Sequence, residues 1–310
     1  MFRGVDHVGV GVADMTEATE FYSEKLGFRR VLFDYTGPLP GVERVTGRVE
    51  TRAHVVMLGA EHVGPLGQGG IKLVQLLEPA YTPPLPEGLA WGEVGISEIC
   101  VNTSGHEKVF RHLVEELNCQ SLMDRVVDPL PPFGITTALS YVADPYGGKV
   151  ELIEWSDIWK GLPCEPQLEG VNHVAFGVKD MERTLQFYSR FGLTNLLFEF
   201  DGYFDAMAHW YKPSPPKQHI VLFTSWIGAG IEPVQHDPPS ADLRGEWGHA
   251  GPMEFAIGVS NLDRAYEELC GEGVDFHTPP QSIDVGCGEW RYAYLSDPDE
   301  LYVSLVEARY

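Results

Sequence analysis

The sequence predicts an α+β fold in which four βαβββ modules form two domains. Residues 4–14 (GVDHVGVGVAD) recur as residues 170–180 (GVNHVAFGVKD), so His7 and His173 hold equivalent positions in the two halves. A strand–helix opening followed by strand patterns then occurs twice in each half. Repetition of this kind is typical of chains assembled from copies of one supersecondary unit.

The first module begins with a strand pattern at residues 5–12, where small and β-branched residues alternate. Asp14 is the expected N-cap of the next helix, with Glu17 three residues later as in a capping box. Apolar residues follow at helical spacing as far as Gly27, a typical residue just beyond a helix end. The three further strands are expected at 28–35, 47–58 and 71–78.

The same plan recurs along the rest of the chain. Residues 95–155 repeat it, with a helix at 106–118 and a DPYGG turn between the last two strands. Residues 170–237 and 252–307 supply the third and fourth copies. Residues 156–169 contain Pro and Gly and form the expected linker between the halves.

The linker predicts one domain on each side of it, built from modules that are neighbours in the sequence. The expected N-terminal domain is 1–157, with modules 1–90 and 94–157, and the expected C-terminal domain is 168–310, with modules 168–240 and 250–310. Internal duplication of this kind would give each half its own core.

Composition excludes several classes of partner. The formal net charge of −23 disfavours binding to nucleic acid or to an anionic membrane, because phosphate recognition needs a basic surface. No apolar run approaches the roughly 20 residues of a membrane span, and the N-terminal residues do not resemble a signal peptide. The five cysteines form no CxxC pair. We therefore expect a cytoplasmic protein with reduced thiols and a small-molecule substrate, as a monomer or a homodimer.

Three segments resemble the vicinal oxygen chelate superfamily: GVDHVGVGVADMTEATEFYSEKLGF, IKLVQLLEP and DPYGGKVELIE. That superfamily includes glyoxalase I, methylmalonyl-CoA epimerase, bleomycin and fosfomycin resistance proteins, and extradiol dioxygenases. The resemblance covers nearly the whole chain. It implies that modules pair into U-shaped mixed β-sheets with helices outside, and that metal ligands lie on the concave face. It does not identify the reaction, because one fold serves unrelated chemistries.

Strand alternation gives the first half a complete set of candidate ligands in the positions that the resemblance implies. These are His7, Gln75, Glu98 and Glu151. One imidazole, one amide and two carboxylates suit a single divalent ion of Fe, Mn, Co, Ni or Zn. We therefore expect the metal in the N-terminal domain.

The same register in the second half is incomplete. It gives His173, Gln235, Glu254 and Ser304. Because a serine replaces the last carboxylate, the second half is expected to be a degenerate copy.

The ligand set resembles that of the glyoxalase–epimerase branch, which implies proton transfer through an enediolate. In such a reaction the metal is a Lewis acid and a carboxylate is the base. Glu151 or Glu98 is the candidate base, since a carboxylate in a dry cleft has a raised pKa. The expected enzyme is an epimerase, isomerase or lyase acting on a small oxygenated carbonyl or hydroxy-acid substrate.

Substrate contacts are predicted from the strand at 48–57, where charged residues alternate with small and apolar ones. If the charged face lines the cup, Arg48, Arg52 and His54 bind an anionic substrate group and Glu50 is a second acid–base residue. The alternative is a solvated outer face. Tyr141 is a candidate for the cup wall.

Two other functions remain open at this stage. Tyr141, Asp144 and Glu151 match the end of the extradiol dioxygenase signature, but the histidine expected before the tyrosine is missing. A ring-cleaving non-haem iron enzyme normally uses two histidines and a carboxylate. A metal-free binding protein, as in bleomycin resistance, is the other alternative.

Overall fold

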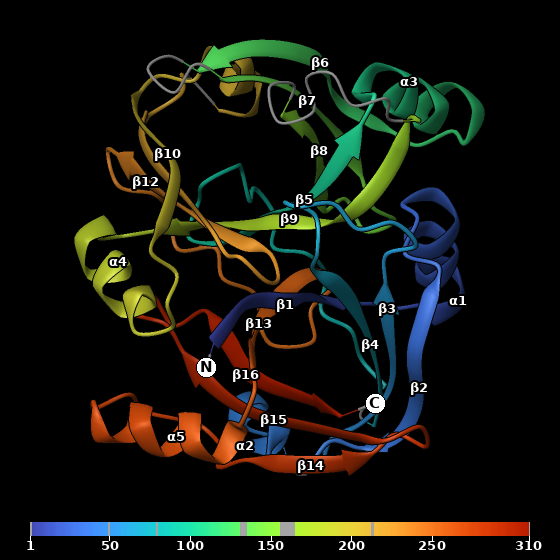
Figure 1. Cartoon of the computed structure of the whole chain (residues 1–310), viewed down its shortest axis with the longest axis vertical. Helices are drawn as coiled ribbons and strands as arrows, with labels where there is room; N and C mark the ends of the chain where they lie inside the picture. The colour runs from blue at the N-terminus through green and yellow to red at the C-terminus, as the bar shows by residue number, and fades with distance from the viewer. Residues whose placement is uncertain are drawn as a thin grey trace.

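The computed structural model describes residues 2–48, 50–78, 80–130, 135–155, 165–211 and 214–309. Within them the chain forms two strongly curved mixed sheets, with helices outside and four repeats of the βαβββ plan (Figure 1). The predicted fold class is confirmed. No helix in the described part is both long and apolar enough to cross a membrane.

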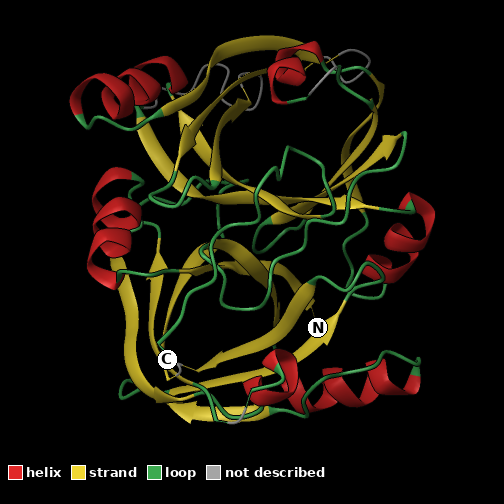
Figure 2. Cartoon of the chain, turned by 180° about the vertical axis from the view of Figure 1, so that it is seen from behind, coloured by secondary structure: helices red, strands yellow, loops and turns green. Residues whose placement is uncertain are grey.

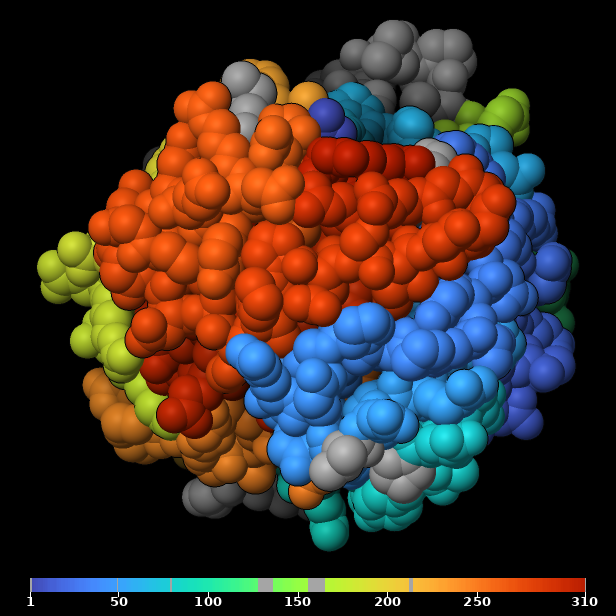
Figure 3. Space-filling view, turned by 90° about the horizontal axis from the view of Figure 1, so that it is seen from below, coloured from blue at the N-terminus to red at the C-terminus, as the bar shows by residue number. Residues whose placement is uncertain are grey.

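The first sheet combines the first and fourth modules. Its strands are β1 (Phe2–Gly11), β2 (Arg30–Pro38), β3 (Arg52–Gly59), β4 (Gly70–Glu78), β13 (Gly251–Val259), β14 (Gln281–Asp284), β15 (Glu289–Ser296) and β16 (Tyr302–Arg309). Their order across the sheet is β14-β15-β16-β13-β1-β4-β3-β2. Figure 3 shows the result on the surface, where the blue N-terminal and red C-terminal segments lie side by side.

The second sheet combines the second and third modules. Its strands are β5 (Gly95–Ser104), β6 (Ser121–Leu130), β7 (Ile135–Ala143), β8 (Lys149–Trp155), β9 (Gln167–Val178), β10 (Asn195–Gly202), β11 (Lys217–Thr224) and β12 (Gly230–Asp237). Their order is β10-β11-β12-β9-β5-β8-β7-β6.

This pairing corrects the prediction that the first two modules form one domain and the last two form the other. The opening strands meet as antiparallel pairs, β1 with β13 and β5 with β9. Each opening strand needs a partner for its free edge, and the similar modules offer equivalent edges, so the repeat alone does not choose among them. Residues 156–164 of the expected linker lie outside the described residues.

The two modules of each half still touch, through a helix and a turn. The hydroxyl of Tyr22, in the first helix, donates to Asp144 in the second module at 3.0 Å. The hydroxyl of Tyr188 donates to Asp297 in the fourth module at 3.1 Å. Both carboxylates sit in Asp-Pro turns and also accept backbone N–H groups. These contacts tie the two sheets together.

The helices of the four βαβββ repeats lie on the outside of the sheets (Figure 2). They are α1 (Met15–Thr19) continuing into η1 (Glu20–Lys25), α3 (His106–Arg111) continuing into η2 (His112–Glu116), α4 (Met181–Ser189) and α5 (Leu262–Gly271). Two short additional helices, α2 (Val42–Thr46) and the 3₁₀ helix η3 (Asp205–Trp210), instead pack against the concave faces of the first and second sheets through Val42 and Met207. The α2 helix was not predicted, and β3 begins at Arg52 rather than at residue 47.

The predicted ends of the first helix are confirmed. Asp14 accepts the N–H groups of Thr16 and Glu17 at 2.8 and 3.1 Å. Gly27 follows with a φ of 78°, a left-handed conformation that favours glycine. Asp180 caps α4 in the same way as Asp14 caps α1. Each cap fixes where its helix leaves the preceding strand.

The main hydrophobic core lies between the sheets and their helices, and the two concave faces are packed separately. The cup of the first sheet is closed by large side chains that include Trp247, Trp290 and Tyr294. The cup of the second sheet contains a cavity of about 270 Å³. The four described cysteines, Cys100, Cys119, Cys270 and Cys287, form no disulfide with one another.

Candidate metal centre

The structure does not bring the four predicted ligands together. His7 and Gln75 lie on β1 and β4 of the first sheet, whereas Glu98 and Glu151 lie on β5 and β8 of the second sheet. The predicted metal site within the N-terminal half is therefore wrong as a set. The modules pair across the sequence, so one cup draws its residues from both halves of the chain.

Four residues converge on the concave face of the second sheet, and we call them the second-sheet cluster. They are Glu98, Glu151, His173 and Glu232. The Nε2 atom of His173 lies 3.4 Å from Glu98 Oε1, 3.5 Å from Glu151 Oε2 and 3.5 Å from Glu232 Oε2. All four residues are buried.

Strand pairing explains why these residues meet. In β5 and β9, which are antiparallel, Glu98 is opposite Ala175 and Cys100 is opposite His173. On the other side of β5, Cys100 is level with Glu151 of β8. On the other side of β9, Ala175 is level with Glu232 of β12. The cluster is thus built from four adjacent strands, two from each module.

A buried chain of hydrogen bonds orients the imidazole. The Nδ1 atom of His173 lies 2.7 Å from the side-chain oxygen of Asn172. Asn172 donates to Asn102 at 3.1 Å, and Asn102 donates to Glu169 at 2.7 Å. An amide oxygen can only accept, so Nδ1 carries the proton in this contact when the ring is neutral. The lone pair of Nε2 then faces the carboxylates.

An indole holds one of the carboxylates. Trp91 Nε1 donates to Glu98 Oε2 at 2.6 Å, which leaves Glu98 Oε1 directed at His173. Neither Glu98 Oε1 nor His173 Nε2 has a hydrogen-bond partner among the described residues. When the ring is neutral, two buried acceptor atoms therefore face each other at 3.4 Å.

Burial and mutual repulsion perturb the cluster. Burial raises the pKa of Glu151 well above its usual value, and the nearby Glu98 raises it further. Burial also raises the pKa of Glu232. Burial on its own lowers the pKa of His173, but the carboxylates of Glu232, Glu98 and Glu151 bring it to about 10. Three buried carboxylates around one imidazole call for additional positive charge.

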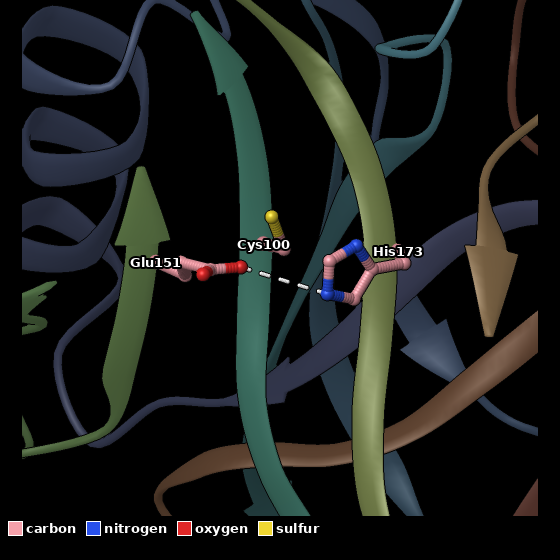
Figure 4. A group of neighbouring side chains, drawn as sticks. All are labelled: Cys100, Glu151 and His173. Carbon is pink, nitrogen blue, oxygen red and sulfur yellow. Dashed lines mark ion pairs between the residues drawn. The ribbon is translucent and has the colours of Figure 1, made fainter. Parts of the chain in front are cut away.

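A thiol stands beside this group. Cys100 lies next to Glu151 and His173, with one possible ligand atom of each residue within 4.8 Å of the others (Figure 4). Burial, followed by the charge of Glu151, raises the pKa of the Cys100 thiol well above its usual value.

The donor set fits a divalent cation. One imidazole and three carboxylates are hard to borderline ligands suited to Fe, Mn, Co, Ni or Zn in the divalent state. His173 Nε2 and Glu98 Oε1 are buried polar atoms without a hydrogen-bond partner, as expected of atoms that coordinate an ion. Glu98 and Glu151 were predicted as ligands, whereas His173 was assigned to a degenerate copy and Glu232 was missed.

Glu232 was missed because the sequence prediction chose the glutamine on this strand as the ligand. Gln75 Nε2 donates to the carbonyl of Ala13 at 2.8 Å, and Gln235 Oε1 accepts the N–H of Met181 at 2.6 Å. Both glutamines therefore fasten a strand to the start of a helix. Glu232 is three residues before Gln235 and so faces the opposite side of the strand. A lone glutamate in the apolar run IEPV was the available signal.

The first sheet has an equivalent set with a different composition, which we call the first-sheet counterpart. It consists of His7, Lys72, Glu254 and Ser304. Lys72 takes the place of Glu232, because Gly70 is level with His7 as Gly230 is level with His173. Trp247 donates to Glu254 at 2.6 Å, as Trp91 does to Glu98.

Lys72 supplies the positive charge in the first-sheet counterpart. Its side chain is 1% exposed, and its ammonium forms an ion pair with Glu254 and lies 3.3 Å from the hydroxyl of Tyr294 and 5.1 Å from the ring centre of Trp290. Burial alone would raise the pKa of Glu254, but the ammonium lowers it overall. An ammonium already stands where a cation would bind, so the first-sheet counterpart does not fit a metal.

The predicted charged wall of the cup is absent. Arg48 contacts Glu246 at 3.4 Å and Arg52 contacts Glu78 at 3.8 Å. His54 lies 2.8 Å from Asp34, and Glu50 is exposed with a φ of 44°. These residues lie on or next to β3 in the first sheet, and none of them lines the second-sheet cavity. This placement is consistent with the alternative of an outer face for Arg52, His54 and Glu50, whereas the side chain of Arg48 is only 22% exposed.

Tyr141 does line the cavity, as predicted. Its side chain is fully buried, and burial followed by the charge of Glu151 raises the pKa of its hydroxyl well above the usual value. The other aromatic rings around the cavity are Trp91, Trp155, Phe198, Phe200 and Phe204. Glu151 and Glu232 reach this wall, whereas Glu98 does not. The cluster therefore opens into an aromatic pocket.

A family model described as the Glyoxalase/Bleomycin resistance protein/Dioxygenase superfamily matches residues 4–152 and 170–305. The chain belongs to this superfamily. Among solved structures, it is similar to a single-residue variant of glyoxalase I from Zea mays, at 16% identity and a TM-score of 0.63, covering 98% of this chain and 92% of that one. It is also similar to a candidate dioxygenase from Bacillus subtilis subsp. subtilis str. 168, at 15% identity and a TM-score of 0.62, covering 99% and 85%.

At this level of identity the likeness to those structures concerns the fold. Membership of the glyoxalase/bleomycin resistance/dioxygenase superfamily agrees with the two curved sheets and with the resemblance noted from the sequence. The chain has a four-residue donor cluster in the second sheet, and a lysine stands in the equivalent pocket of the first sheet.

Proposed function

We propose that the protein is a metal-dependent enzyme whose active site is the second-sheet cluster. It would move a proton at a carbon next to a carbonyl, as an isomerase, epimerase or lyase. One observation carries the proposal: the unpartnered Nε2 of His173 lies 3.4–3.5 Å from three buried carboxylates beside a cavity.

Glu98, Glu151, His173 and Glu232 would hold the ion, one divalent Fe, Mn, Co, Ni or Zn. When bound, it would supply Lewis-acid stabilisation of negative charge on two adjacent substrate oxygens. The hydrogen-bonded chain behind His173 and the indole on Glu98 keep both ligands aimed without the ion. Preorganisation of this kind strengthens binding because little ordering is needed.

The proton would be taken by Glu151 or Glu232, the two carboxylates that reach the cavity, whichever of them is released from the ion when substrate binds. Burial raises the pKa of both, which brings a carboxylate closer to the proton affinity that abstraction near neutral pH requires. Glu98 is a weaker candidate than the sequence suggested, because Trp91 already occupies one of its oxygens. The hydroxyl of Tyr141 is placed to donate to a substrate oxygen.

The alternatives receive less support. A ring-cleaving iron enzyme normally presents two histidines and one carboxylate, whereas this cluster has one histidine and three carboxylates. A metal-free binding protein would have to keep three carboxylates buried around one imidazole without a further cation, which is costly.

The test compares two matched variants. We expect Glu151→Gln to lose most bound metal and all α-proton exchange, and Ser304→Ala, at the equivalent position of the first sheet, to retain both. Metal content after reconstitution is measured by elemental analysis, and exchange by deuterium incorporation from D₂O. Loss of metal in Ser304→Ala but not in Glu151→Gln would move the site to the first sheet.

Oxygen consumption separates the remaining functions. Exchange of the α-proton without oxygen uptake supports the proposal. Oxygen uptake with a catechol would instead favour the dioxygenase. Absence of stoichiometric metal after reconstitution would favour the binding protein.

A further inference from the structure

The cavity beside the second-sheet cluster has walls that are mostly apolar. Besides its aromatic rings, it is lined by Leu139, Ile153, Met207 and Ile220. The polar side chains in the wall are Thr137, Tyr141 and the two carboxylates of the cluster. No lysine, arginine or histidine lines the cavity in the part of the chain that the structure describes. A substrate anion would therefore find no counter-charge there.

Lys149, the first residue of β8, is a cationic side chain near the cluster, but it already has interaction partners. Its Nζ donates to the carbonyl of Leu89 and lies 5.7 Å from the ring centre of Trp210. Burial lowers its pKa. It is not part of the cavity wall.

The charge of the cluster also disfavours an anionic substrate. Within the cluster, three carboxylates carry three negative charges, so a divalent ion leaves one negative charge when His173 is neutral. The charge of Lys149, which acts on Glu98, offsets this residual charge only in part because Lys149 lies outside the cavity wall. In a low-dielectric pocket this residual charge repels a carboxylate or a phosphate. The acidic chain, with a formal net charge of −23, adds a repulsive field.

The size of the cavity limits the body of the ligand. An engineered apolar cavity of roughly 150 Å³ binds benzene in another protein. A volume of about 270 Å³ therefore accommodates a six-membered ring with a short substituent. The aromatic rings offer edge and face contacts to such a ring.

We propose that the substrate is an uncharged molecule with an aromatic or other apolar ring-sized body and two adjacent oxygens, such as an α-hydroxy ketone. Substrates that carry a carboxylate or a phosphate are selected against. The inference rests on the proposed function for the two oxygens, whereas the wall of the cavity alone supports the uncharged, apolar body.

The test uses two probes of nearly equal size. 2-Hydroxyacetophenone is neutral and phenylglyoxylate is anionic, and each has a phenyl ring and adjacent oxygens. Binding to the Co²⁺-loaded and the metal-free protein is measured by calorimetry. We expect the neutral probe to bind at least about tenfold more tightly in both states, which is about 1.4 kcal/mol. Equal or tighter binding of phenylglyoxylate overturns the proposal, as does absence of neutral-probe binding at its solubility limit.

A pair of variants tests whether the wall of the cavity determines the preference for the neutral probe. Phe200 lies in the cavity wall on β10 and is not fully buried, whereas Leu196, on the same strand, is 50% exposed and outside the wall. Phe200→Lys is expected to shift the preference towards phenylglyoxylate by at least about tenfold, and Leu196→Lys to leave it unchanged. Thermal unfolding confirms that both variants fold. An unchanged preference in Phe200→Lys overturns the assignment of the cavity.

Metal content measured in the same samples keeps the two proposals apart. If Co²⁺ binds but the anionic probe is preferred, the substrate class is wrong and the metal site stands. If no Co²⁺ binds but the neutral probe is still preferred, the proposed function fails and the assignment of an uncharged, apolar ligand stands.

Discussion

Lys72 and Glu232 hold equivalent positions in the two sheets, and their charges are opposite. In the first sheet the ammonium of Lys72 compensates Glu254, whereas in the second sheet Glu232 adds a third carboxylate around His173. Both pockets keep an indole on the glutamate and a side-chain oxygen on the histidine Nδ1. The first sheet also has Ser304 where the second has Glu151, so two substitutions, Lys72 for Glu232 and Ser304 for Glu151, distinguish the pocket that fits a cation.

Removal of that ammonium should destabilise the fold. Lys72→Met leaves the buried Glu254 without a counter-charge, which typically costs about 3–5 kcal/mol. Chemical denaturation measures the loss. The double variant Lys72→Met/Glu254→Gln removes both charges and should recover most of it. Equal destabilisation in the single and double variants would contradict a compensating role for Lys72.

The two indoles allow a second matched comparison. Trp91→Phe removes the donor that holds Glu98, so we expect metal affinity to fall about 10- to 100-fold. Trp247→Phe removes the same donor from Glu254 in the first sheet and should leave metal affinity unchanged. Competition with a chelator measures both. Equal metal affinities in the two variants would show that the indole on Glu98 does not support the site.

At the scale of elements, the sequence predicted well the features that depend on residues close together in the chain. The cap at Asp14, the turn at Gly27 and the alternation that exposes Glu98 and Glu151 to one face all depend on residues close in sequence. Ligand partners were predicted less well. Gln75 and Lys72 lie on one strand three residues apart, and it takes their tertiary contacts, Gln75 with Ala13 and Lys72 with Glu254, to show that Lys72 faces the cup.

The contact between α4 and the turn before β16 should respond to pH. Burial raises the pKa of Asp297 to about 7, although backbone N–H groups and the hydroxyl of Tyr188 favour its charged form. The folded protein thus retains this proton more strongly than the unfolded chain, where the pKa is about 3.9. The contribution of Asp297 to stability is present below that value and is lost as pH rises from about 4 through 7.

Asp297→Asn isolates this effect, because an amide keeps an acceptor for the backbone and cannot ionise. The stability of the wild type relative to Asp297→Asn should fall by up to about 4 kcal/mol between pH 4 and pH 8. Denaturation at several pH values measures the difference. Parallel pH profiles for the two proteins would show that Asp297 does not hold its proton in the folded state.

At the scale of the whole molecule, the repeat predicted four modules but not which of them pair. Modules one and two share a helix–turn contact through Tyr22 and Asp144, yet their strands belong to different sheets. Because every opening strand presents a similar edge, pairing depends on the sum of many distant contacts. The cluster is consequently divided, with Glu98 and Glu151 in the first half and His173 and Glu232 in the second.

Separation of the halves tests this division directly. When the chain is cut within residues 156–164, neither fragment contains all four members of the second-sheet cluster. We expect neither fragment alone to bind Co²⁺ stoichiometrically, and an equimolar mixture to form a one-to-one complex that binds one ion. A mixture whose first half carries Glu151→Gln should assemble without restoring tight binding. Stoichiometric binding by the first fragment alone would instead support sheets that each combine the two modules of one half, because only that arrangement gives one half a complete cup.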